Sequence, residues 1–201
     1  MIKGYYFITD ASLSLKGNLN DVEMAVEAGT KIIQYRNKKA ETRELFEGAV
    51  GLMKKCTNTL FIINDRIDIA LAVDADGAHL GQEDMPYKVA RKLLGKDKIL
   101  GITVHNIEEA NEAYRAGADY LAVSPVFKTK TKHDAGKPIG LELIKDIKKN
   151  MNIHVVAIGG IDLTNAPSVI SAGADSLCAI SSVITKEDVK KEIEKFQELF
   201  K

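Results

Sequence analysis

Short apolar runs rich in β-branched residues alternate along the chain with longer segments in which apolar residues recur at helical spacing. The runs predict strands at residues 5–9, 31–36, 60–64, 77–80, 99–104, 120–123, 154–158 and 176–180. The longer segments predict helices at residues 21–28, 42–55, 66–73, 87–94, 107–116, 141–149, 163–172 and 187–200. A helix follows every strand, and this strict alternation is typical of a parallel sheet.

Eight repeats of this unit favour a closed barrel over an open sheet, because closure leaves no unpaired strand edge. Runs such as 60–64 and 154–158 are continuously apolar, as expected for strands that are buried on both faces. No linker or low-complexity stretch divides the 201 residues. We therefore expect an α/β protein with the (β/α)8 TIM-barrel fold, formed by a single domain over residues 1–201.

Glycine recurs at the predicted helix ends. Gly29, Gly117 and Gly173 each follow an alanine, and a looser version of the pattern ends at Gly77. Glycine readily adopts the left-handed conformation that ends a helix. Any α/β protein uses glycine in this way, but four occurrences, each before an even-numbered strand, favour a barrel.

The amino-acid composition and net charge exclude some classes of binding partner. Hydrophobic residues make up 45% of the chain, enough for a sizeable core, and 28 basic residues balance 28 acidic ones. The zero net charge argues against nucleic acid or an anionic membrane as partner, so an anionic ligand requires a local basic cluster. The two distant cysteines and the absence of a signal-peptide or membrane-spanning pattern lead us to expect a cytoplasmic protein. Whether it forms a homo-oligomer stays open.

In a TIM barrel the active site lies at the carboxyl ends of the strands. After the second strand, alternation places Gln34, Arg36 and Lys38 on one side of an extended segment. Arginine presents a planar fork to phosphate oxygens, and lysine adds a compact charge. The segment is either an anion site or a solvated basic loop, and Gln34 within an apolar strand favours the anion site.

Acidic residues follow the next two strands. Asn64 and Asp65 end the third strand, and Asp84 follows the fourth. Each aspartate has two interpretations, as the N-cap of the next helix or as a ligand of Mg²⁺. Neighbouring strands would bring both carboxylates together, and such a pair repels unless a cation or a proton lies between them. We expect the cation, in a Mg²⁺ site that a diphosphate completes.

The remaining strand ends carry hydroxyl groups, lysines and glycines. Thr103 ends the fifth strand, and the 125–138 segment after the sixth contains Thr129, Thr131 and Lys132, which suits a loop that binds a polyanion. Glycines after strand seven and serines after strand eight, including Gly160 and Ser181, suit a backbone phosphate site. None of the four histidines belongs to a nucleophile–base–acid pattern, and His79 within the fourth strand suits a hydrogen-bonded core position.

Six segments together resemble the thiamine-phosphate synthase family over almost the whole chain, in order, spacing and position at strand ends. They are QYRNK, FIINDR, ADGAHLGQEDMP, ADYLAVSPVFKTKTKHDAGKPIG, VVAIGGI and AISSVI. The resemblance implies an enzyme of thiamine biosynthesis, a transferase. It would join 4-amino-2-methyl-5-hydroxymethylpyrimidine diphosphate to a thiazole phosphate with Mg²⁺ and release pyrophosphate.

The resemblance also implies roles for individual residues. It assigns Gln34, Arg36, Lys38 and Asn64 to the pyrimidine diphosphate, Asp65 and Asp84 to Mg²⁺, and Thr103 to the neighbourhood of the pyrimidine. It assigns Thr129, Thr131, Gly160, Ile180 and Ser181 to the thiazole phosphate, and Lys132 to the pyrophosphate. Arg36, Lys38 and Lys132 would be catalytic, by stabilising charge on the departing pyrophosphate.

One departure and two alternatives accompany this interpretation. Ser124-Pro125 stands where many relatives have Gly-Pro, which bears on the fit of the substrate but removes no charge. A related thiazole tautomerase would need an acid–base group but no diphosphate site. A non-catalytic barrel that binds a phosphate ligand would need the Gly160 and Ser181 site but not the paired aspartates.

Overall fold

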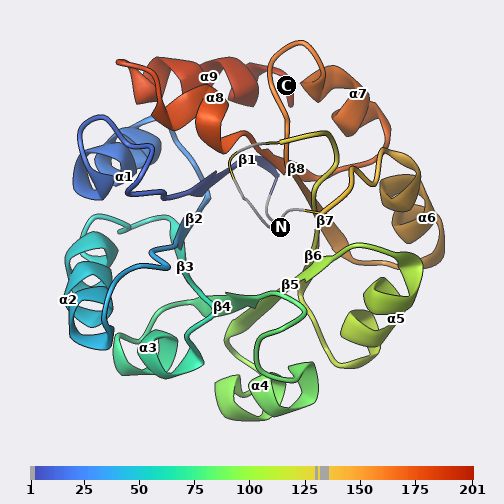
Figure 1. Cartoon of the computed structure of the whole chain (residues 1–201), viewed down its shortest axis with the longest axis horizontal. Helices are drawn as coiled ribbons and strands as arrows, with labels where there is room; N and C mark the ends of the chain where they lie inside the picture. The colour runs from blue at the N-terminus through green and yellow to red at the C-terminus, as the bar shows by residue number, and fades with distance from the viewer. Residues whose placement is uncertain (1–2, 130, 132–135) are drawn as a thin grey trace.

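Eight parallel strands form a closed barrel in the computed structural model, which describes residues 3–129, 131 and 136–201. The strands are β1 (Gly4–Ile8), β2 (Ile32–Tyr35), β3 (Leu60–Asn64), β4 (Gly77–Leu80), β5 (Ile99–Val104), β6 (Tyr120–Val123), β7 (His154–Ile158) and β8 (Ser176–Cys178). Each strand pairs with the next in sequence, and β1 pairs with β8 to complete the ring (Figure 1). The predicted TIM barrel is confirmed.

Helices surround the barrel on the outside (Figure 1). They are α1 (Asn18–Glu27), α2 (Thr42–Met53), α3 (Ile67–Ala72), α4 (Tyr87–Leu94), α5 (Ile107–Arg115), α6 (Glu142–Asn150), α7 (Ala166–Ser171), α8 (Ile180–Ile184) and α9 (Val189–Glu198). The sequence predicted a final strand that reached Ile180, and this was wrong. Strand β8 ends at Cys178, and Ile180 begins the short extra helix α8.

Side chains alternate between the barrel interior and the layer under the helices. Tyr6 and Ile8 of β1 belong to the interior cluster, whereas Tyr5 and Phe7 belong to the large core between strands and helices. This two-residue period is what a strand buried on both faces requires. The barrel interior is therefore filled with packed side chains. Residues at the carboxyl ends of the strands lie directly above this packed layer.

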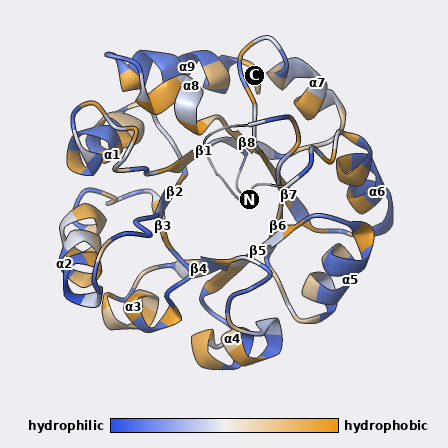
Figure 2. Ribbon diagram, viewed as in Figure 1, coloured by the Kyte–Doolittle hydropathy of each residue, from blue (hydrophilic) through white to orange (hydrophobic). Residues whose placement is uncertain are grey.

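The helices are two-sided, and each carries hydrophobic as well as hydrophilic residues (Figure 2). In α6, for example, Leu143, Ile144 and Ile147 are buried while Lys145 is exposed. This spacing places one apolar stripe against the sheet. Within the described ranges, none of the helices has the length and apolar composition needed to cross a bilayer.

Glycine ends three helices as predicted, with φ of 76° at Gly29, 87° at Gly117 and 106° at Gly173. The looser fourth case was wrong. Asp74 takes the left-handed conformation there, with φ of 56°, while Gly77 lies inside β4. A Cβ atom at Gly77 would collide with the backbone carbonyl of Ile99 on the neighbouring strand. The glycine at this position therefore permits close strand approach.

Candidate active site

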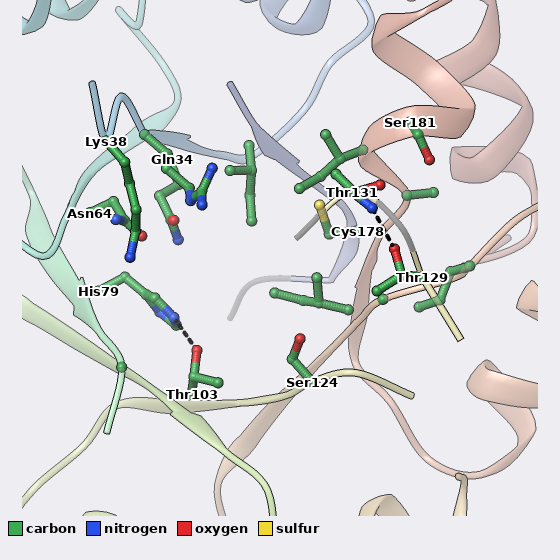
Figure 3. Close-up of a pocket in the computed structure, with 18 of the residues that line it drawn as sticks. Gln34, Lys38, Asn64, His79, Thr103, Ser124, Thr129, Thr131, Cys178 and Ser181 are labelled. Atoms are coloured by element: carbon green, nitrogen blue, oxygen red, sulfur yellow. Dashed lines mark hydrogen bonds between the residues drawn. The ribbon is translucent and has the colours of Figure 1, made fainter. Parts of the chain in front are cut away.

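A pocket opens at the carboxyl ends of the strands and encloses about 890 Å³, including space open to solvent. Its lining includes every described residue that the sequence predicted for the site: Gln34, Arg36, Lys38, Asn64, Asp65, Asp84, Thr103, Thr129, Thr131, Gly160, Ile180 and Ser181. Figure 3 shows several of them around the opening. Lys132 lies outside the described residues.

The end of β1 holds Arg36 in place. The Thr9 hydroxyl accepts a hydrogen bond from the Arg36 backbone nitrogen at 2.9 Å and donates one to its carbonyl oxygen at 3.2 Å. Asp10, which is 8% exposed, places a carboxylate oxygen 3.5 Å from a guanidinium nitrogen of Arg36. The guanidinium is thereby oriented at the pocket wall before any ligand arrives. Thr9 and Asp10 were missed from the sequence, although both follow a strand directly.

Asp65 and Asp84 lie side by side at the ends of β3 and β4. Burial and the neighbouring Asp84 carboxyl raise the pKa of Asp65 to about 6, and Lys38 opposes this shift in part. The Lys38 ammonium lies 3.3 Å from an oxygen of Asp65. Two acids so close disfavour each other's charged form, and a cation between them would relieve the repulsion.

Neither aspartate caps a helix through its side chain. Helices α3 and α4 begin after Arg66 and Pro86 without a side-chain cap, so the N-cap interpretation of both acids was wrong. Asp84 instead accepts a 2.7 Å hydrogen bond from the backbone nitrogen of Gly81. Asp65 takes a left-handed backbone conformation, with φ of 63°, which is uncommon for a residue other than glycine.

The donor set fits a magnesium ion that is partly ligated by substrate. Asp65 and Asp84 supply carboxylate oxygens, the ligands that this hard cation prefers. Among the described residues no group of three or more His, Cys, Asp or Glu side chains could hold a metal ion. A cation at the pair would therefore need further oxygens from water or a ligand, which is usual for Mg²⁺.

Thr103 reaches the pocket from β5, and its hydroxyl lies 2.8 Å from Nε2 of His79 (Figure 3). The expected core position of His79 is confirmed, because it is 5% exposed with both ring nitrogens in hydrogen bonds. His79 also lines the pocket, a position that the sequence did not indicate. The hydroxyl of Ser124 points into the same space (Figure 3).

The segments after β6 and β7 are joined on the opposite side of the pocket. The backbone nitrogen of Phe127 donates to the carbonyl of Gly159 at 3.0 Å. Gly160 has φ of 64°, and a Cβ atom there would meet the Lys128 carbonyl oxygen at 2.5 Å. Glycine is needed at this position for both reasons, and its backbone stays accessible to a ligand. Thr129 accepts a 3.2 Å hydrogen bond from the Thr131 nitrogen.

Helix α8 points its first turn at the pocket. Ile180 and Ser181 begin the helix and line the pocket, and no side chain caps it. Its first backbone N–H groups have no partners within the helix, as at any helix start. With Gly160 nearby in the lining, this end of the pocket offers backbone donors to a phosphate, an arrangement that recurs after strands seven and eight of TIM barrels.

The family model described as thiamine monophosphate synthase matches residues 5–183. A thiamine-phosphate synthase from Methanosarcina mazei is 52% identical over 198 residues, which cover 98% of this chain and 82% of that protein. A thiamine-phosphate synthase from Chloroflexus aurantiacus is 46% identical over 187 residues, covering 92% and 86%.

Two solved structures superpose on the whole barrel. The thiamine phosphate pyrophosphorylase from Pyrococcus furiosus superposes with a TM-score of 0.90 at 43% identity, covering 98% of this chain and 95% of that one. The 3-hexulose-6-phosphate synthase from Salmonella typhimurium has a TM-score of 0.78 at 16% identity, which shows a shared fold only.

Proposed function

This chain belongs to the thiamine monophosphate synthase family, and from that premise we propose that it is a thiamine-phosphate synthase. In this reaction a pyrimidine diphosphate and a thiazole phosphate give thiamine phosphate and pyrophosphate. The chain is then a transferase of thiamine biosynthesis. The observation that carries the proposal is that basic residues, a carboxylate pair and a glycine-rich backbone site line one pocket.

The diphosphate end of the pocket is formed by β2, β3 and β4. Arg36, which Asp10 and Thr9 hold in place, offers a two-pronged donor to phosphate oxygens. Lys38 contributes a second positive charge beside Asp65. Both side chains neutralise negative charge that grows on the diphosphate as it departs, and electrostatic stabilisation of this kind commonly contributes more to catalysis than any other effect.

Asp65 and Asp84 would hold Mg²⁺ beside these cations. When bound, the ion would neutralise charge on the diphosphate oxygens. The raised pKa of Asp65 supports this assignment, because the pair lacks the compensating charge that it needs when both acids are ionised. Lys38 supplies only part of it.

The thiazole phosphate would lie at the other end. Gly160, Ile180 and Ser181 offer backbone donors to its phosphate, while Thr129 and Thr131 offer hydroxyl groups. The two anionic groups are thus held at separate ends of one pocket. This arrangement leaves the pyrimidine and thiazole rings to meet between them, so that binding converts an encounter in solution into a positioned reaction.

The chemistry needs no nucleophile from the protein. The bond between the exocyclic methylene carbon of the pyrimidine and the diphosphate oxygen breaks, and its electron pair leaves with the diphosphate. The thiazole nitrogen then donates its lone pair to that carbon and forms the new C–N bond. Arg36 and Lys38 stabilise the leaving group, and the backbone site positions the attacking ring. From the sequence resemblance, Lys132 would assist at the pyrophosphate.

A direct assay tests this proposal. Purified protein is mixed with both substrates, with and without Mg²⁺, and thiamine phosphate and pyrophosphate are quantified. We expect equal amounts of the two products, formed only with Mg²⁺ and both substrates present. Ligand binding without turnover would instead indicate a phosphate-binding barrel. A rearranged thiazole without pyrophosphate release would indicate a tautomerase.

Two lysine variants make the assay specific for the site. Lys38→Ala removes a half-exposed lysine that is paired with Asp65, and Lys55→Ala removes a similarly exposed lysine that is paired with Glu23 outside the pocket lining. Loss of one stabilising charge typically costs about a hundredfold in kcat. We expect that loss for Lys38→Ala and less than about a twofold change for Lys55→Ala. Equal activities would remove Lys38 from the mechanism.

A further inference from the structure

A line of hydrogen-bonded polar side chains crosses the interior of the barrel below the pocket. The Gln34 amide nitrogen donates to the Tyr6 hydroxyl at 2.9 Å, and the Tyr6 and Tyr120 hydroxyls lie 2.7 Å apart. Nδ1 of His79 lies 2.9 Å from the Tyr120 hydroxyl, and its Nε2 lies 2.8 Å from the Thr103 hydroxyl. This line of hydrogen bonds connects two pocket-lining residues, Gln34 and Thr103, through side chains of β1, β6 and β4.

The two tyrosines in the middle of this line have no role at the pocket surface. Tyr6 is 0% and Tyr120 1% exposed, and neither lines the pocket. Burial raises the pKa of both phenols well above the usual value, so each hydroxyl keeps its single proton. A buried polar group is costly without a hydrogen-bond partner. Each of these hydroxyls must therefore donate its proton in one direction along the line.

The direction follows from the amide at one end. With its nitrogen toward Tyr6, Gln34 can only donate, so the Tyr6 hydroxyl accepts from it and donates its own proton to Tyr120. Tyr120 then donates to Nδ1 of His79. A neutral imidazole that accepts at Nδ1 carries its proton on Nε2, and that proton is donated to the Thr103 oxygen.

This one-way order fixes what the pocket presents to a ligand. The Gln34 carbonyl oxygen has no donor among the described residues, so it stays an acceptor for a ligand. The Thr103 oxygen already accepts from His79, so its own proton is available to a ligand. At its two ends the line therefore presents one acceptor, from Gln34, and one donor, from Thr103, and reversal of the line would exchange them.

Packing keeps the line in place. The His79 and Tyr120 rings stack with centroids 5.5 Å apart, and the Tyr6 and Tyr120 rings lie 5.8 Å apart. A Cβ atom at Gly101 of β5 would collide with the Tyr120 ring, so glycine provides the space that the phenol fills. Rings held this tightly cannot turn away to find other partners.

We propose that Tyr6, Tyr120 and His79 are positioning residues that fix Gln34 as a hydrogen-bond acceptor and Thr103 as a donor, and thereby select an aminopyrimidine ring. The proposal rests on the proposed function for the identity of the ligand. An aminopyrimidine carries an exocyclic amino group that donates and ring nitrogens that accept, which complements this display. The 4-oxo analogue has an acceptor in place of the amino group and a ring N–H in place of a bare nitrogen, so it matches the reversed line instead.

The first test measures the proton on His79 without any ligand. Nitrogen-15 NMR distinguishes the two neutral tautomers of histidine, and the His79→Gln spectrum identifies the signal. We expect a single tautomer protonated on Nε2 in the wild type. Tyr120→Phe removes the donor to Nδ1 and leaves only the Thr103 hydroxyl, which can donate or accept, so we expect a mixture of both tautomers in that variant.

A matched variant separates this role from simple packing. Tyr5 of β1 is, like Tyr120, a buried tyrosine. It is 2% exposed, and its hydroxyl donates a hydrogen bond to the Ala179 carbonyl at 3.2 Å, outside the line. Tyr5→Phe thus also removes one buried hydroxyl and one hydrogen bond. We expect Tyr5→Phe to keep the wild-type tautomer. An Nδ1-protonated or mixed wild type, or an unchanged Tyr120→Phe variant, would overturn the proposal.

The second test measures selectivity by calorimetry with Mg²⁺. The probes are the monophosphates of the 4-amino and 4-oxo pyrimidines, which resemble the substrate but lack the diphosphate leaving group. We expect the wild type and Tyr5→Phe to bind the amino form at least about tenfold more tightly, and Tyr120→Phe to lose most of that ratio.

The two tests fail in different ways. A Tyr120→Phe variant that keeps the full ratio refutes the selective role of the line. If neither probe binds to the wild type, the proposed function is wrong. The tautomer measurement then decides alone whether the line has the inferred direction.

Discussion

His154 makes the stability of the barrel depend on pH. It begins β7 at the end of the barrel away from the pocket, and its side chain is 9% exposed. Burial lowers the pKa of His154 to about 4; Asp175 opposes the shift and Lys148 adds to it. The Asp175 oxygen 3.7 Å from Nδ1 already accepts from Lys148 at 2.9 Å and from the Val155 nitrogen at 2.9 Å. Nδ1 has no hydrogen bond among the described residues.

The sign and size of the effect follow from linkage. The unfolded chain binds a proton at His154 near the ordinary pKa of about 6.5, whereas the folded chain binds it only near 4. Stability is therefore fully present above about pH 6.5 and is lost as pH falls toward 4. Between about pH 8 and pH 5 the difference is about 2 kcal/mol in the free energy of unfolding, or about 4–8 °C in Tm for a chain of this size.

The assay is urea unfolding of the wild type and His154→Gln at several pH values. Glutamine does not titrate and keeps an amide that can reach the Ser176 hydroxyl, the 3.2 Å partner of Nε2. Subtracting the two curves cancels all other titrating groups. We expect the difference in free energy to shift by about 2 kcal/mol in favour of the variant between pH 8 and pH 5. A flat difference curve would refute the reasoning.

Three further outcomes are expected. Asp84→Asn keeps an acceptor for the Gly81 nitrogen but removes one carboxylate, so Mg²⁺ should no longer raise the Tm; an unchanged Mg²⁺ effect in scanning fluorimetry would count against the site. Arg36→Lys keeps the charge beside Asp10 but loses the planar fork, so steady-state kinetics should show kcat lower by about tenfold or more, and a wild-type kcat would contradict this. Gly77→Ala should destabilise by more than about 1 kcal/mol because of the collision with the Ile99 carbonyl, whereas Gly51→Ala, in open space on α2, should be neutral or stabilising in urea unfolding; similar values would contradict the packing argument.

The strands were predictable because burial on both faces leaves a strong signal. Four of the middle strands, β3 to β6, have the predicted bounds, and so does β7. Helix ends were less predictable because local side-chain hydrogen bonds decide them. The predicted helix 163–172 begins only at Ala166, since Asp162 accepts hydrogen bonds from the Thr164 and Asn165 nitrogens and holds the preceding residues in a turn.

The pocket lining was predictable where a residue follows a strand and carries charge, as for Arg36 and Asp65. The sequence did not predict which side chains contact one another across the barrel interior. Tyr6 and Tyr120 are 114 positions apart, and their contact depends on the alignment of every strand between β1 and β6. Each alone is an ordinary aromatic residue of a buried strand. Helix α8 escaped prediction because its five residues are too few to show a helical period.

The left-handed backbone at Asp65 has an evolutionary consequence. Such a conformation costs a residue with a side chain on the order of 1–3 kcal/mol, and glycine would adopt it freely. In the proposed function, Asp65 therefore lowers the stability of the protein in exchange for a ligand to a divalent ion. A lineage that no longer needed the ion would gain from glycine there, so the aspartate should persist only under continued selection for turnover.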